Sequence, residues 1–155
     1  MNIDKTNEKI IDQLSSFLRG EISAVETYRM ARDRVSVVGP QGDIDHCMRS
    51  HEERVQALTS RIVALGGEPA RSSGLWGAFA KMVEGGAAIL GEAAAIAALE
   101  EGEDHGVRDY RSALDKNDDL DVSIRAFVGE LLEKQLRTHA VMSNLKKVGK
   151  QAAAH

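Results

Sequence analysis

Apolar side chains recur every three or four residues along four long stretches of the chain, which is the spacing of one face of an α-helix. Long β-branched runs are absent, whereas Ala, Leu, Glu, Arg and Lys are plentiful, and this composition favours helix. We therefore predict an all-α chain with helices over about 4–37, 43–65, 87–114 and 120–148. Asp43 is the expected N-cap of the second helix.

The connections between these predicted helices are short, long and short in chain order. The long one contains an amphipathic segment, Leu75–Val83, which we expect to form a helical crossover over the bundle with Trp76 and Phe79 packed inwards. A four-helix bundle with one crossover requires a long connection between its second and third helices. We therefore expect a single four-helix-bundle domain over 1–149, followed by a frayed tail at 150–155.

Composition restricts the compartment and the partners. The net charge of −4 comes from interspersed acids and bases, so no basic face for nucleic acid is expected. The lone Cys47 excludes an internal disulfide and fits a reducing compartment. The N-terminus carries no signal pattern, and the most apolar run, 85–99, is interrupted by Glu92 and too short to span a bilayer. We expect a cytoplasmic protein that binds neither nucleic acid nor membrane.

The main candidate chemistry lies in a repeated pattern, Gly-Glu-x3-Val-x2-Tyr-Arg-x-Ala, which occurs once in the first predicted helix and once in the third. It puts Glu21 and Glu103 in the middle of apolar stripes, where a carboxylate is costly unless something pairs with it. Tyr28 and Tyr110 follow two turns later. We interpret them as core aromatics whose hydroxyls bond a nearby polar group, in preference to electron relays. The pattern itself names no reaction.

Three segments carry a resemblance to a known family: Gly20-Glu21-x6-Tyr28, Leu65-Gly66-Gly67-Glu68-Pro69 and Glu101-Gly102-Glu103-Asp104-x5-Tyr110. They resemble the ferritin-like superfamily, especially rubrerythrin-like four-helix bundles and a bacterial branch catalogued as a domain of unknown function. The resemblance implies a bundle with one crossover, a site for iron or manganese, and self-association, for which we expect a dimer.

The full site implied by this resemblance takes one Glu from each of two helices and Glu-x-x-His from each of the other two. Glu21 and Glu103 match the single-glutamate positions. In the second helix Glu53-Arg54-Val55-Gln56 stands at the expected level, but it ends in glutamine and its glutamate points away from the apolar stripe. In the fourth helix Gln135-Leu136-Arg137-Thr138-His139 contains no Glu-x-x-His. The di-iron motif is incomplete.

One alternative replaces the metal with a side-chain cation. Arg54 then pairs with Glu21 or Glu103, while Gln135 bonds a carboxylate. Arginine suits this role because it stays charged and offers a fork of donors. We favour this alternative because Arg54 and Gln135 are poor companions for iron. It predicts a non-catalytic protein that acts through structure or partner binding.

The other alternative is a reduced metal site. Glu21, Glu103 and His51 supply two carboxylates and one imidazole, with Glu52 or His139 as less favoured ligands. Such a set could hold iron, manganese or zinc. It predicts a metal-binding oxidoreductase or an iron-handling protein. His51 also has a structural interpretation, as a hydrogen-bonded core residue, which its apolar neighbours on the stripe favour.

Overall fold

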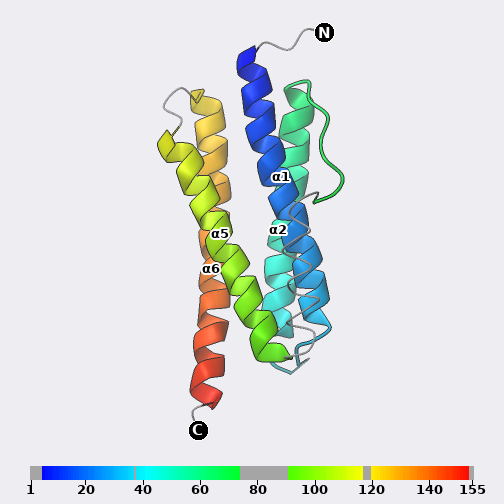
Figure 1. The fold of residues 1–155 in the computed structure, drawn as a ribbon, viewed down its shortest axis with the longest axis vertical. Coiled ribbons are helices and arrows are strands. Elements are labelled where there is room, and N and C mark those ends of the chain that lie inside the picture. Colours follow the sequence, from blue (N-terminus) through cyan, green and yellow to red (C-terminus); the bar gives the residue numbers. More distant parts are fainter. Residues whose placement is uncertain (1–4, 37, 74–90, 117–119, 154–155) are drawn as a thin grey trace.

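The computed structural model describes residues 5–36, 38–73, 91–116 and 120–153, which form four α-helices and, within these ranges, no β-strand (Figure 1). The helices are α1 (Lys5–Arg32), α2 (Gln41–Ala64), α5 (Glu92–Lys116) and α6 (Val122–Ala153). The prediction of an all-α chain with four long helices is confirmed.

Three predicted boundaries differ from the structure. The first helix ends at Arg32, before the predicted 37, because the chain turns where Arg34 N–H donates to Ala31 O over 2.9 Å. Pro40 is the N-cap of α2 in place of Asp43, which lies in the first turn; proline has no N–H to satisfy there. The last helix continues to Ala153, so residues 150–153 of the expected tail are helical, as their alanines favour.

Two further predictions cannot be compared with the fold. The crossover helix over Leu75–Val83, with Trp76 and Phe79, lies outside the described residues. The same holds for the start of the third predicted helix, residues 87–90.

The helices form two antiparallel hairpins, α1–α2 and α5–α6, and α1 also contacts α5 while α2 contacts α6. Figure 1 shows that α2 and α5 run in the same direction. The connection of residues 65–91 therefore joins opposite ends of the bundle, as a crossover topology requires. No helix in the described ranges has both the length and the apolar character of a membrane span.

The core has two apolar clusters with a polar layer between them. One cluster includes Leu14, Leu18, Leu58, Ile62 and Leu131; the other includes Ala31, Ile44, Cys47, Leu99 and Met142. Full burial of each large aliphatic side chain contributes roughly 1.5–3 kcal/mol. These clusters supply the stability that offsets the cost of burying charged groups in the layer between them.

Candidate functional site

The polar layer receives two side chains from each helix. They come from the same inward stripes as the apolar core, and none of them exposes more than 4% of its surface. The eight residues, called the central network below, are Glu21 and Tyr28 on α1, His51 and Arg54 on α2, Glu103 and Tyr110 on α5, and Gln135 and Thr138 on α6.

His51 joins the two glutamates. Its Nδ1 lies 2.5 Å from Glu21 Oε2 and its Nε2 lies 2.6 Å from Glu103 Oε1. A carboxylate only accepts hydrogen bonds, so both ring nitrogens must donate and the ring must be an imidazolium. Burial alone would lower the pKa of His51, but the carboxylates of Glu103 and Glu21 raise it above its ordinary value. His51 is therefore a buried cation.

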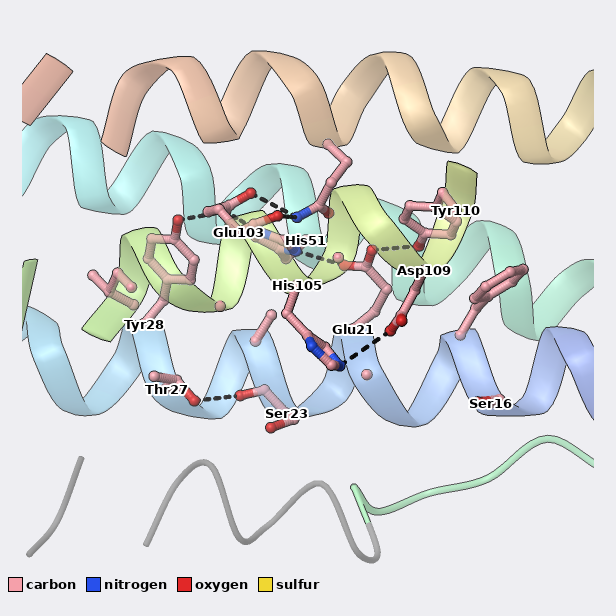
Figure 2. Close-up of a pocket in the computed structure, with 17 residues that line it drawn as sticks. Ser16, Glu21, Ser23, Thr27, Tyr28, His51, Glu103, His105, Asp109 and Tyr110 are labelled. Carbon is pink, nitrogen blue, oxygen red and sulfur yellow. Dashed lines mark hydrogen bonds and ion pairs between the residues drawn. The ribbon is translucent and has the colours of Figure 1, made fainter. Parts of the chain in front are cut away.

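Two tyrosines extend this contact into a continuous chain of hydrogen bonds, visible in Figure 2 as Tyr28–Glu103–His51–Glu21–Tyr110. Each tyrosine Oη donates over 2.5 Å to the glutamate of the other copy of the repeat. Burial, followed by the facing carboxylate, raises the pKa of both tyrosines well above the ordinary value. Both therefore remain protonated donors.

Arg54 supplies the second cation and is fully buried. Its Nη1 donates to Glu21 Oε1 over 3.3 Å and to Gln135 Oε1. Its Nη2 donates to Thr138 Oγ1 over 3.0 Å and to Ser50 Oγ over 3.2 Å. The structure thus pairs Arg54 with Glu21, one of the two glutamates named from the sequence.

The remaining oxygen of Glu103, Oε2, accepts from Gln135 Nε2 over 2.8 Å and from Thr138 Oγ1 over 2.7 Å. Burial would raise the pKa of both glutamates, but neighbouring charges and donors reverse this. His51 lowers that of Glu103, and Arg54 with His51 lowers that of Glu21 to about 2. Two carboxylates and two cations therefore cancel within the central network.

Gly106 makes room for the Gln135 amide against α5. Gln135 Nε2 donates to the backbone oxygen of Glu103 over 2.9 Å. A Cβ at position 106 would lie only 2.7 Å from Gln135 Cδ, and nearer still to Nε2. The glycine therefore serves the central network, although it costs roughly 1 kcal/mol of helix propensity relative to alanine.

The other residues named from the sequence lie outside this network. Glu53 and Gln56 are exposed on α2, and Glu52 is half-buried with no hydrogen bond to the central side chains. His139 lies near the surface, with Nε2 3.6 Å from Asp104 Oδ1 and 4.0 Å from Glu100 Oε1. Ser50 and Thr138 were not identified as site residues from the sequence. Thr138 lies three residues after Gln135, on the same buried face of α6, but a hydroxyl at such a position is also common in ordinary helices.

The donor set does not fit a two-metal centre. Such a centre takes one glutamate from each of two helices and Glu-x-x-His from the others. At that spacing α2 offers His51 and Arg54, and α6 offers Gln135 and Thr138. A guanidinium cannot be a ligand and repels a metal cation, while both His51 nitrogens already face carboxylates. Within the described ranges, no three or more His, Cys, Asp or Glu side chains are arranged to hold a metal ion.

A cavity of about 80 Å³ lies between α1 and α5, against the central network (Figure 2). It exists because small residues face each other there, namely Gly20, Ala24, Gly102 and Gly106. Its lining also includes the exposed His105 and the half-buried Asp109, whose Nε2 and Oδ2 are 3.4 Å apart. A space of this size fits a few water molecules or a very small ligand.

Fold and centre together define an α-helical bundle protein built around a buried, charge-balanced hydrogen-bond network. The chain belongs to the family described as domain of unknown function DUF2383, whose model matches residues 9–116. The match contains every central residue on α1, α2 and α5, whereas those on α6 lie beyond it. No curated protein and no solved structure is similar enough to match.

Proposed function

We propose that this protein is a ferritin-like bundle protein without catalytic activity, in which His51 and Arg54 stand where a metal pair would stand. It acts through its structure or through contact with a partner. The two antiparallel hairpins and the connection between opposite ends support the ferritin-like assignment. The observation that carries the proposal is the imidazole of His51 bonded at both nitrogens to Glu21 and Glu103.

A network of this kind favours one packing of the four helices. Sliding one helix by a residue turns its side chains by about 100° and would leave buried charges unpaired. Within the described ranges, every buried side-chain nitrogen and oxygen has a hydrogen-bond partner. The central groups are thus engaged with one another, which supports a structural role over acid–base chemistry.

A second candidate is a metal-binding oxidoreductase or iron-handling protein centred on the same glutamates. The proximity of Glu21, Glu103 and His51 favours it, because carboxylates and imidazole bind iron or manganese, although the three side chains would have to rearrange around a common position. His51 would first have to lose a proton, since only a neutral imidazole is a ligand.

The proposal includes a cytoplasmic location, which the composition favours, and self-association as a dimer, which the family resemblance implies. The buried free thiol of Cys47 supports a reducing compartment. Burial raises its pKa to about 12, so it stays a neutral thiol.

Elemental analysis of the purified protein separates the two candidates, with Glu21→Ala and Glu103→Ala as comparison variants. The structural proposal predicts metal far below one ion per chain, and an unfolding curve that neither a chelator nor added ferrous iron changes. Stoichiometric iron or manganese that is lost in both variants would overturn it in favour of the metal-binding candidate.

A further inference from the structure

The two hairpins of the bundle have equivalent inward positions. Tyr28 donates to Glu103 and Tyr110 donates to Glu21, so the repeated motifs exchange the same contact in both directions. On the other helices His51–Arg54 and Gln135–Thr138 are both three residues apart, and one constant offset relates the two pairs. These features are those of two halves related by an approximate twofold axis.

The two halves differ in charge. Hairpin α1–α2 brings one carboxylate, Glu21, and two cations, His51 and Arg54, to the centre. Hairpin α5–α6 brings one carboxylate, Glu103, with the neutral Gln135 and Thr138. The central groups of hairpin α1–α2 are therefore net positive, and those of hairpin α5–α6 are net negative. Unlike halves cancel when they pack together, whereas two like halves would bury uncompensated charge.

We propose that this charge division is a pairing rule: hairpin α1–α2 accepts hairpin α5–α6, from its own chain or from a second copy, and rejects a copy of itself. Without this difference in charge, the two hairpins would have similar packing surfaces, and shape alone would not distinguish pairing of like hairpins from pairing of unlike hairpins. The partner in self-association is then the opposite hairpin of a second copy, exchanged through the connection of residues 65–91. This inference rests on the metal-free centre proposed above.

Two full-length double variants test the rule. Gln135→His/Thr138→Arg gives both hairpins the cationic pair of a histidine and an arginine. His51→Gln/Arg54→Thr gives both hairpins the neutral pair of a glutamine and a threonine. Each variant alone buries like charges, and we expect its melting temperature to be roughly 10 °C or more below that of the wild type. When the two are unfolded and refolded together, unlike hairpins can pair across chains, and one of the two interfaces formed is identical to the wild-type interface.

The mixture is measured by native mass spectrometry with one variant isotope-labelled, and by circular dichroism during heating. The pairing rule predicts a one-to-one complex of the two variants and a melting transition above that of either variant alone. A mixture that melts as the sum of its components, or forms like pairs as readily as unlike pairs, overturns the rule.

A quadruple variant that combines all four substitutions in one chain keeps the test decisive if the double variants fold poorly. It exchanges the two sets between the hairpins and restores neutrality, so it should melt above both double variants. A melting temperature below both would refute the equivalence of the halves. Elemental analysis of the wild type tests the metal-free centre separately, because pairing can fail while no metal is found.

Discussion

Replacing Gly106 by alanine should have two opposite effects on stability: a gain from higher helix propensity and a loss from disturbed hydrogen bonds in the central network. Alanine in a helix interior is about 1 kcal/mol more favourable than glycine, so propensity alone predicts a more stable protein. The new Cβ, however, would lie 2.7 Å from Gln135 Cδ and nearer still to Nε2. The amide of Gln135 would have to move, and with it the hydrogen bonds that it makes.

The hydrogen bonds of the Gln135 amide determine how large the destabilisation by Gly106→Ala should be. Gln135 Nε2 donates to Glu103 O and Oε2 over 2.9 and 2.8 Å, and its Oε1 accepts from Arg54. Hydrogen bonds to charged groups contribute roughly 1.5–3 kcal/mol each. Losing two of them, less the gain of about 1 kcal/mol in propensity, predicts a net destabilisation of about 2–5 kcal/mol. For a chain of this size the melting temperature should fall by roughly 4–20 °C.

Urea denaturation followed by circular dichroism measures this change, and Gly129→Ala on α6 is the matched control. A Cβ at position 129 meets no atom within 4 Å, so this variant should be unchanged or more stable by up to about 1 kcal/mol. Truncation by Gln135→Ala should also make Gly106→Ala much less costly in the double variant, because the clash disappears. If Gly106→Ala is as stable as Gly129→Ala, the Gln135 geometry is wrong.

Further predictions concern the charges and the two tyrosines. Tyr28→Phe and Tyr110→Phe should each lower the free energy of unfolding by a similar amount, about 1.5–3 kcal/mol, because each removes one bond to a buried carboxylate; in urea titrations, widely different losses would argue against the reciprocal arrangement. Arg54→Met should cost about 3–5 kcal/mol, because it leaves a carboxylate uncompensated; a stability equal to that of the wild type would contradict the ion pair. The lowered pKa of Glu21 contributes stability that is present above the unfolded value of 4.5 and is lost as the pH falls towards 2. The raised pKa of His51 contributes stability that is fully present below the unfolded value of 6.5 and is lost as the pH rises through the folded value. Urea denaturation midpoints measured across pH should therefore be highest between pH 4.5 and pH 6.5.

Much of the fold was predictable because the apolar residues that drive helix packing recur at a regular spacing along the sequence. The apolar spacing predicted four helices, and the difference in connection lengths favoured a crossover. Helix ends were harder to predict. Asp43 is a good N-cap residue, yet α2 begins at Gln41, because Pro40 already has a suitable conformation at φ −77° and needs no N–H partner. Local propensity offers several acceptable ends, and tertiary contacts choose among them.

The site was predictable only in part. Glu21 and Glu103 stood out because carboxylates on an apolar stripe require partners, and Arg54 and Gln135 were the nearest such partners. The bridging geometry of His51 could not be read from the sequence, because it depends on where three helices meet. Thr138 and His139 are adjacent on α6, so their side chains point about 100° apart around the helix axis. This difference puts the threonine in the core and the histidine near the surface.

The protonation state of His51 tests the central claim most directly, since only an imidazolium can donate to both glutamates. Long-range ¹H–¹⁵N NMR of the wild-type protein at neutral pH resolves the two ring nitrogens, and His51→Gln identifies their signals by their loss. We predict that Nδ1 and Nε2 both carry protons that exchange slowly with water. A His51 ring with one unprotonated nitrogen, or with a nitrogen bound to a metal, would contradict a centre balanced by side-chain cations.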